Sequence, residues 1–242
     1  MKHIVINCNS IYKTFPIYHH LTGGIKNLLF HFPTAIRSMR KTSYTALENF
    51  NMEIASGEAV GIIGKNGAGK STILGLLAGV LKATSGQIKV EGRIAPLLEL
   101  GAGFHPELSG RENILLNGIL LGMLKRDIEV KIDEIISFSE LKNFIDQPIR
   151  TYSSGMLARL GFSVAVHSEP DILLVDEVLA VGDQDFQEKC IEKMIDFKKI
   201  GKTIVLVSHN MDELKIICDR AILIKGGQSF KEGKTEDVLP FY

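Results

Sequence analysis

The fold is decided by one stretch, GKNGAGKS at residues 64–71. It fits the pattern G-x-x-x-x-G-K-[ST], which is typical of a loop that binds phosphate groups. The apolar run Glu58–Ile63 before it predicts a strand, and Lys70–Gly79 after it predicts a helix. Backbone N–H groups in a glycine-rich loop and at a helix N-terminus attract anions, because both carry partial positive charge. We therefore expect a polyphosphate site at this loop.

Each residue type in the loop has a role in such a site. We expect Lys70 to reach the β- and γ-phosphates, Ser71 to hold Mg²⁺ and Thr72 to add a phosphate contact. The expected nucleotide-binding residues of the loop are Gly64, Asn66, Gly67, Ala68, Gly69, Lys70, Ser71 and Thr72. The alternative is a glycine-rich turn that merely precedes a helix. The strand, the lysine and the hydroxyl at their required positions argue against it.

A second group of polar residues follows a buried strand. Four apolar residues, Ile172–Val175, end in Asp176 and Glu177. Ligands of α/β sheets bind at the carboxyl ends of the strands, so both acids are placed at such an edge. We expect Asp176 to support Mg²⁺ through its water shell, and Glu177 to polarise the attacking water. The alternative is a strand that merely ends in a polar turn, and the phosphate loop upstream disfavours it.

The rest of the chain alternates apolar strands with amphipathic helices. This pattern predicts a parallel sheet covered on both faces. Residues 101–147 carry no strand signal, and we interpret them as a helical subdomain inserted into an α/β core. The other predicted strands are His3–Cys8, Ile88–Glu91, Leu97–Leu100, Thr203–Val207 and Ala221–Ile224, and the predicted helices are Arg111–Leu124, Asp127–Ser139, Ser154–His167, Gln184–Lys199, Met211–Cys218 and the tail after Thr235.

Composition narrows the classes of function. The chain has 242 residues, with 28 Lys and Arg against 28 Asp and Glu, and this balance argues against a general nucleic-acid binder. Cys8, Cys190 and Cys218 lie far apart and indicate reduced thiols of a cytosolic protein. The sequence shows no signal peptide and no apolar run long enough to span a bilayer. If the protein works at a membrane, we expect another chain to supply the spans.

One motif lies between the phosphate loop and the acidic strand. It is Tyr152-Ser153-Ser154-Gly155-Met156, at the start of a predicted helix. Alone it is a serine cap followed by a glycine, a common helix start. In this position it resembles the L-S-G-G-Q signature motif of ABC-type ATPases, in the variant form Y-S-S-G-M.

Further stretches resemble elements of the same family. Ala180–Asp183 resembles the D-loop, which assigns Asp183 to it, and Ser208-His209 resembles the loop of the switch histidine, which implies a catalytic role for His209. Lys13–Phe15 resembles the loop whose aromatic ring stacks on adenine. Phe15 is the candidate for that stacking, and Tyr12 is its competitor.

One element departs from the family pattern. Family members usually have a glutamine that senses Mg²⁺ and the transport partner, whereas residues 97–104 contain none. Glu99 is the best match and the expected metal contact, although an ionised carboxylate cannot donate a hydrogen bond.

The resemblance implies a fold and a shared site. It implies one nucleotide-binding domain over residues 1–242: an α/β P-loop NTPase core of the ABC type, with an antiparallel β N-terminal portion and an inserted α-helical subdomain. The approximate parts are an N-terminal insertion at 16–45, the helical and signature subdomain at 101–168, and the rest of the core at 169–242. Ser153–Met156 of one copy would complete the ATP site at Gly64–Ser71 of a second copy. ATP binding would close the homodimer, and hydrolysis would open it.

The branch of the family is suggested by residues 16–45. Together with the signature and acidic segments, this insertion resembles the ATP-binding subunit of bacterial O-antigen polysaccharide exporters. That implies export of a lipid-linked polysaccharide at the cytoplasmic face of the inner membrane, with two copies of a multi-span permease and without nucleic acid. Capsule or teichoic-acid export and a non-transport switch are the alternatives. The predicted helix Ile25–Phe32 either packs on the sheet or meets the membrane surface.

Overall fold

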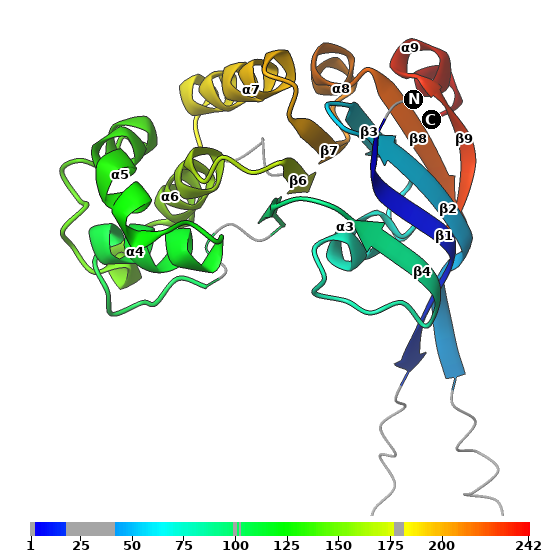
Figure 1. Cartoon of the computed structure of the whole chain (residues 1–242), viewed down its shortest axis with the longest axis horizontal. Helices are drawn as coiled ribbons and strands as arrows, with labels where there is room; N and C mark the ends of the chain where they lie inside the picture. Colours follow the sequence, from blue (N-terminus) through cyan, green and yellow to red (C-terminus); the bar gives the residue numbers. More distant parts are fainter. Residues whose placement is uncertain (1–2, 18–41, 99–100, 102, 177–181) are drawn as a thin grey trace, which may run out of the picture.

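The computed structural model describes residues 3–17, 42–98, 101, 103–176 and 182–242. Strands gather on one side of the molecule, and a lobe of helices lies on the other (Figure 1). Three of the predicted features fall outside the described residues. These are the acids Glu99 and Glu177 and the helix Ile25–Phe32.

The larger sheet is mainly parallel, as the alternating pattern predicts. Among the described residues its order is β5 (Ile94–Leu97), β6 (Ile172–Asp176), β7 (Thr203–Val207), β3 (Ala59–Ile63), β8 (Arg220–Lys225) and β9 (Gln228–Lys234). Only β9 runs antiparallel to its neighbour. The sequence pattern missed β9 because its residues are mostly polar and exposed. Strands β3 and β7 are buried along their whole length, so the centre of the sheet is the core of the molecule.

A smaller antiparallel sheet confirms the expected N-terminal portion. Its order is β2 (Thr42–Ala55), β1 (Ile4–Ile17) and β4 (Ser85–Val90). Strand β1 continues well beyond the predicted His3–Cys8, because it pairs with β2 as far as Ile17 opposite Thr42. Residues 16 and 17, at the start of the 16–45 stretch, therefore pair with residues 43 and 42 near its end.

The predicted strand Leu97–Leu100 was wrong in its position along the chain. The observed strand is β5, which pairs with β6 from Ile94 to Leu97. Pro96 lies inside β5, and it is tolerated because an edge strand can leave one side without donors. The described chain then turns at Gly101, whose φ is 99°.

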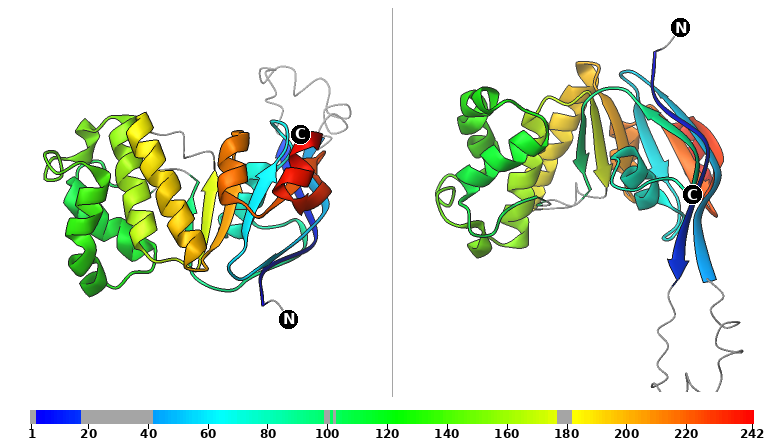
Figure 2. Two further views of the ribbon diagram at one scale, coloured as in Figure 1. Left: turned by 90° about the horizontal axis from the view of Figure 1, so that it is seen from above. Right: turned by 60° about the horizontal axis from the view of Figure 1, so that its bottom comes forward.

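Helices cover both faces of the larger sheet. Helix α3 lies between the two sheets and shares a core with β1, β2 and β3, whereas α7 and α8 pack on the opposite face. The lobe of α4–α6 has its own apolar core and lies to one side of the strands (Figure 2). The helices are α3 (Lys70–Leu77), α4 (Gly110–Leu120), α5 (Lys125–Ser139), α6 (Ser154–His167), α7 (Gln184–Lys199), α8 (Met211–Ile217) and α9 (Thr235–Val238), with 3-10 turns η1 (Ile149–Thr151) and η3 (Leu239–Phe241). Within the described part of the chain, no helix has the length and apolar character needed to cross a bilayer.

Candidate functional site

The predicted site residues end three adjacent strands. Ile62 of β3 is opposite Val207 of β7, and Val207 is opposite Asp176 of β6. The three strands are parallel, so their carboxyl ends meet at one edge of the sheet. The phosphate loop follows β3, Ser208-His209 follows β7, and Asp176 closes β6. The fold therefore gathers three segments that are far apart in the sequence.

Glycine is required at both ends of the phosphate loop. A Cβ on Gly64 would lie 2.6 Å from the carbonyl oxygen of Ile224. Gly69 has a φ of 106°, and a Cβ there would lie 2.8 Å from the carbonyl oxygen of Ala46 and from Cδ2 of Leu47. Both contacts are shorter than carbon and oxygen atoms allow, so side chains at these positions would displace the loop.

Lys70 is held inside the loop. Its side chain is 6% exposed, and Nζ donates to the carbonyl oxygen of Gly64 at 2.8 Å. The carbonyl oxygen of Lys65 and Nε2 of His209 each lie 3.5 Å from Nζ. Two of these partners are uncharged carbonyl oxygens and the third is a ring nitrogen, so a phosphate would be a stronger partner for the ammonium group. The structure thus brings Lys70, predicted to reach the phosphates, into contact with His209, predicted to be catalytic.

A pocket of about 320 Å³ lies over this loop. Its lining residues are Tyr44, Ala46, Asn66, Gly67, Gly69, Lys70, Ser71 and Thr72. Most of the predicted loop residues are among them. Gly64 lies at the loop's base against Ile224, and Ala68 is buried and lines a neighbouring pocket.

Tyr44 is a pocket residue that the sequence analysis did not single out. Its hydroxyl donates to the carbonyl oxygen of Gly67 at 2.9 Å. Phe15 is directly opposite Tyr44 in the β1–β2 pair, and its ring lies 4.7 Å from Nζ of Lys13. Phe15 does not line the pocket, while its competitor Tyr12 pairs with Ser85 on the other neighbouring strand. Tyr44 on β2 therefore contacts the phosphate loop, and the adenine-stacking role of Phe15 on β1 stays a prediction.

The segment after β7 is fixed by local hydrogen bonds. Ser208 Oγ donates to Glu213 at 2.6 Å, and Asn210 caps α8 by accepting from the backbone of Asp212 at 2.9 Å. His209 extends from this turn with Nε2 towards Lys70 and Nδ1 towards the hydroxyl of Tyr242 at 2.5 Å. The sequence analysis gave no role to Tyr242.

The signature segment lies at the open N-terminus of α6. Ser153 Oγ accepts from the backbone N–H of Met156 at 3.2 Å and so caps the helix. Ser153 and Ser154 are exposed, and among the described residues the atom nearest to a Cβ built on Gly155 is Ser153 Oγ, at 3.8 Å. Tyr152 anchors the turn, because its ring is buried and its hydroxyl donates a hydrogen bond to the carbonyl oxygen of Phe144 at 2.7 Å.

The signature residues are not part of the pocket over the phosphate loop of their own chain. Helix α6 belongs to the helical lobe, whereas α3 lies between the sheets (Figure 1). An anion bound at the exposed N-terminus of α6 would therefore lie outside this pocket.

Asp183 caps α7 and connects it to the signature helix. Its Oδ1 accepts from the backbone of Phe186 at 3.1 Å, and its Oδ2 accepts from Arg159 of α6 at 2.6 Å. Arg159 also donates to Glu140 at 2.6 Å. Hydrogen bonds from Lys189 and then Arg159 lower the pKa of Glu140, and this keeps its carboxylate charged. Arg159 thus links the signature helix to the D-loop residue Asp183. No sequence motif points to Arg159, because its partners are distant in the sequence.

The metal-binding expectations fit the donors that the structure describes. Ser71 lies in the first turn of α3 and lines the pocket, and Asp176 is half-buried at the end of β6. Hydroxyl and carboxylate oxygens suit Mg²⁺, which commonly takes one or two protein ligands and completes its shell with phosphates and water. Among the described residues no three acidic, histidine or cysteine side chains cluster.

Comparisons with known proteins agree with this geometry. The ABC transporter family model matches residues 47–180. An O-antigen export system ATP-binding protein from Klebsiella pneumoniae is 53% identical over 99% of this chain and 98% of its own length. A teichoic acids export ATP-binding protein from Enterococcus faecalis is 46% identical over 83% of this chain and 44% of its own length.

A solved structure shows the same fold. It is a dimeric ATP-binding cassette in a post-hydrolysis state with ADP and Pi, with a TM-score of 0.76 and 22% identity over 95% of this chain and 98% of that one. Taken with the phosphate loop, the acidic strand and the family match, these likenesses place the chain in the ABC transporter family, as one of its ATP-binding and ATP-hydrolysing subunits.

Proposed function

We propose that the chain is the ATPase subunit of an exporter that moves undecaprenyl-linked O-antigen polysaccharide across a bacterial inner membrane. The observation that carries this proposal is its 53% identity, over nearly the whole of both chains, to a protein named for O-antigen export. The teichoic-acid relative is less similar and is matched over only part of its length. ATP bound at Gly64–Ser71 would supply the energy, and the chain would work at the cytoplasmic face.

The position of the signature segment supports a homodimer. An exposed helix N-terminus with Ser153 and Ser154 is a good anion site, yet it lies outside the pocket that contains Lys70. Two copies placed face to face would bring the N-terminus of α6 of each to the phosphate loop of the other. This arrangement repeats the same surface on both subunits, as a two-fold interface requires.

Within the composite site each residue has a proposed task. Lys70 would leave its carbonyl partners for the β- and γ-phosphates, and His209 beside it would contact the γ-phosphate. Ser71 and Asp176 would hold Mg²⁺, which neutralises charge that builds on the phosphates. Glu177, next to Asp176 but outside the described residues, is the proposed base for water.

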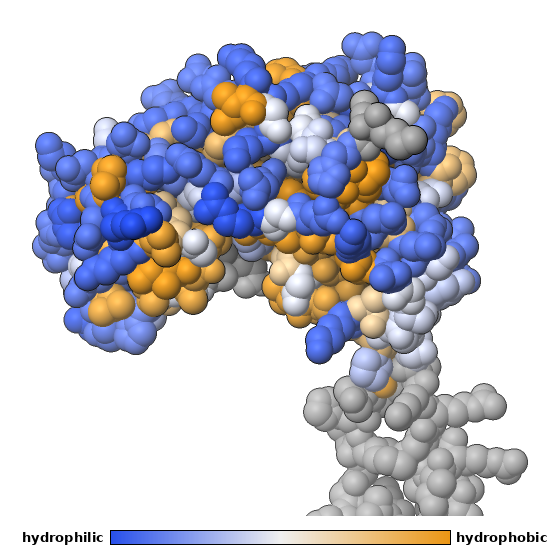
Figure 3. Space-filling model, viewed as in Figure 1, coloured by the Kyte–Doolittle hydropathy of each residue, from blue (hydrophilic) through white to orange (hydrophobic). Residues whose placement is uncertain are grey.

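An apolar groove offers a docking surface for the permease. It has a volume of about 400 Å³ and lies between the end of β5 and helices α4 and α6. Val80 and Leu120 line it and are 74% and 63% exposed. Figure 3 shows hydrophobic surface on both sides of the hollow between the lobe and the sheets. Such exposed apolar surface marks interaction sites, and a cytoplasmic helix of the permease is the occupant we propose.

Capture of the permease tests this surface. Leu120→Asp places a charge in the groove, and we expect it to reduce recovery of a multi-span partner with the tagged chain at least fivefold. Val130→Asp is the matched control, since Val130 is 82% exposed on α5 and does not line the groove. Equal recovery with both variants would place the permease elsewhere.

The cargo is tested with the reconstituted complex. We expect undecaprenyl-linked O-antigen to stimulate ATP hydrolysis by the chain and its permease in liposomes. Stimulation by a lipid-linked teichoic acid or capsule polymer, with none by O-antigen, would reassign the cargo. Stimulation by nucleic acid in the absence of a permease would replace export with a non-transport switch.

A further inference from the structure

Tyr242 lies against the proposed switch histidine. Its hydroxyl oxygen is 2.5 Å from Nδ1 of His209, and the two rings stack with centroids 6.2 Å apart and an angle of 30° between their planes. The backbone N–H of Tyr242 donates to the carbonyl oxygen of Leu239, which fixes the turn that carries the ring. This contact joins the end of η3 to the loop after β7.

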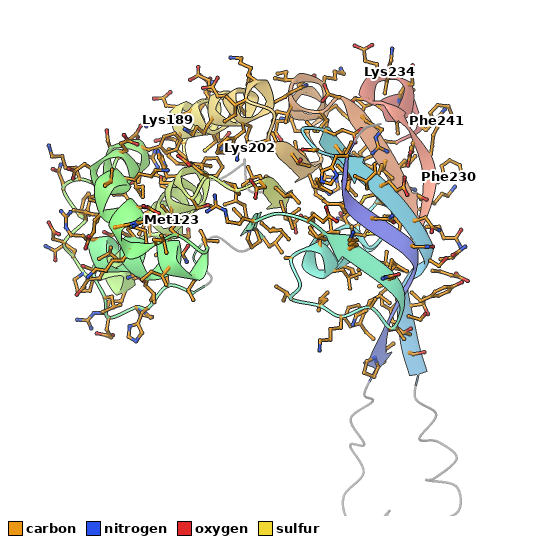
Figure 4. The ribbon with its side chains drawn as sticks, viewed as in Figure 1. Met123, Lys189, Lys202, Phe230, Lys234 and Phe241 are labelled. Carbon is orange, nitrogen blue, oxygen red and sulfur yellow. The ribbon has the colours of Figure 1, made fainter. Side chains whose placement is uncertain are left out.

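The same turn borders the phosphate loop from a second side. Tyr242 lines a pocket of about 420 Å³ together with Lys65–Ala68 of that loop and with Phe230 and Phe241. Figure 4 shows Phe230 and Phe241 at the outer edge of the molecule beside β9. Nζ of Lys231 lies 3.1 Å from the centre of the Phe241 ring. Tyr242 therefore borders both this pocket and His209.

The two ring nitrogens of His209 have different partners. Nε2 faces Nζ of Lys70 at 3.5 Å, and an ammonium group can only donate. A hydrogen bond along this contact therefore needs the lone pair of Nε2, and the proton of the neutral ring is then on Nδ1. Nδ1–H would donate to the hydroxyl oxygen of Tyr242.

Phosphate binding demands the opposite arrangement. A neutral histidine that contacts a phosphate oxygen must donate from Nε2, and this leaves the lone pair on Nδ1. A carbonyl or carboxylate beside Nδ1 could only accept and would oppose that tautomer. A tyrosine hydroxyl can rotate and donate instead, so it suits both arrangements.

We propose that Tyr242 is a positioning residue that supports His209 in both neutral tautomers, and that the ring changes tautomer when phosphate displaces Lys70. This proposal rests on the proposed contact between His209 and the γ-phosphate. Nδ1 releases its proton to water and Nε2 takes one from water, so the charge of the ring is unchanged. The hydroxyl of Tyr242 keeps its own proton throughout and changes only from acceptor to donor.

Steady-state ATP hydrolysis by the full-length chain tests the role of the hydroxyl. Tyr242→Phe keeps the stacked ring and removes only the hydroxyl group. We expect kcat to fall about tenfold or more, while KM for ATP stays within about twofold, since partners that orient a functional histidine typically carry effects of 10- to 100-fold. Phe241→Leu, which alters the same turn but leaves the hydroxyl, is the control and should keep kcat within about twofold.

The His209→Ala variant separates this proposal from the one on which it rests. If His209→Ala keeps wild-type kcat, the phosphate contact of His209 is wrong, and the positioning role of Tyr242 falls with it. If His209→Ala is inactive while Tyr242→Phe keeps kcat within twofold, only the positioning role is overturned.

Nitrogen-15 NMR of the histidine ring gives a readout that a purely structural role would not change. In the wild-type chain we expect a protonated Nδ1 on His209 without nucleotide, and a protonated Nε2 with Mg²⁺ and a non-hydrolysable ATP analogue. In Tyr242→Phe the second state should lose population. The signal is assigned by its absence from His209→Ala. The same tautomer in both wild-type states would overturn the proposal whatever the variants do.

Discussion

Helices α3 and α6 each carry a sequence motif at the N-terminus, yet their N-termini differ in what surrounds them. Helix α3 has no side-chain cap, begins after Gly69 in a left-handed conformation and starts with the buried Lys70. Helix α6 is capped by its own Ser153, and its first turn is exposed. The first end lies in a pocket made by its own chain, while the second faces outward.

The difference between the two helix ends indicates which of them serves ATP binding and which serves turnover. Helix termini of both kinds attract phosphate through their N–H groups. The α3 end supplies, in addition, a fixed cation and a lining contributed by β2. At the α6 end, Ser153 caps its own helix, and the exposed Ser153 and Ser154 lie outside the pocket over the phosphate loop. Binding can therefore be expected to depend on α3, and turnover on α6 of a partner.

Removal of the lysine at the α3 end should have the largest effect. Lys70→Ala deletes the cation that would meet the β- and γ-phosphates, and we expect ATP hydrolysis to fall roughly 1,000-fold with weaker ATP binding. Hydrolysis and nucleotide titration by calorimetry measure the two effects. Lys82→Ala, at an exposed lysine whose backbone oxygen alone contacts Lys13, should match the wild type. A Lys70→Ala variant with unchanged turnover would refute the proposed phosphate site.

The α6 end can be disabled without damage to its helix. Aspartate caps helices as well as serine does, so Ser153→Asp should keep the fold while its carboxylate repels a γ-phosphate across the interface. We expect ATP hydrolysis to fall about 100-fold, with ATP binding to the single chain nearly unchanged.

Mixing the two inactive variants tests whether the site is shared. In a dimer of one Lys70→Ala and one Ser153→Asp chain, one composite site carries both changes and the other carries neither. With random pairing, about half of the dimers are mixed, so roughly a quarter of the sites regain wild-type composition. Hydrolysis should then rise well above that of either variant alone. No recovery would mean that each chain completes its own site.

The sequence alone predicted those elements whose pattern lies within one continuous segment. The strand-loop-helix around residues 64–71 and helices α6 and α7 were placed from local patterns that packing did not override. The carboxyl-edge position of Asp176 followed from the alternation of strands and helices, and its pairing opposite Val207 bears this out.

What sequence could not give were contacts between distant segments. The hydroxyl of Tyr44 reaches the phosphate loop only because β1 and β2 form a long pair, and the predicted strand ended too early to show it. Arg159 meets Asp183, and Tyr242 meets His209, through tertiary packing with no periodic pattern behind it. Polar edge strand β9 was missed for a related reason, since pairing rather than burial defines it.

Matched glycine substitutions should separate the two helix ends by stability. Gly69→Ala introduces a Cβ 2.8 Å from the carbonyl oxygen of Ala46 at a φ of 106°, so we expect a loss of about 1–3 kcal/mol and impaired ATP binding. Among the described residues, a Cβ at Gly155 would lie nearest to Ser153 Oγ, at 3.8 Å, so Gly155→Ala should stabilise α6 slightly, by about 0.5 kcal/mol. Thermal unfolding of the nucleotide-free chain measures both changes.

ATP hydrolysis is the second measurement that compares the two glycine substitutions. Although Gly155→Ala should leave the single chain intact, its added methyl group would face the partner's phosphate in the proposed homodimer, so we expect turnover to fall several-fold. Equal stability losses at Gly69 and Gly155 would show that the two ends are built alike, contrary to the structure.

The smallest expected effect concerns pH and the far end of α6. His167 lies in its last turn, where Nδ1 contacts the carbonyl oxygen of Ser163 at 2.7 Å and the ring packs edge-on against Phe138. Burial lowers the pKa of His167 below its ordinary value of 6.5. The nearby Lys131 and Lys193 also lower this pKa, whereas Glu134 raises it. The unfolded chain therefore binds this proton more readily, so stability should fall as pH drops through about 6.5.

Hydrogen exchange can assign that effect to one helix. Between pH 7.5 and 5.5, after correction for the intrinsic pH dependence of exchange, protection of α6 amides should weaken more than that of α3 amides. The sequence of α3 holds Lys70 as its only titratable group, so α3 serves as the internal reference. In His167→Gln the difference between the helices should disappear, whatever the variant's overall stability. Acids with lowered pKa values, such as Glu140, act only at lower pH and do not contribute in this range. An unchanged difference between the helices in His167→Gln would therefore assign the pH dependence to groups other than His167.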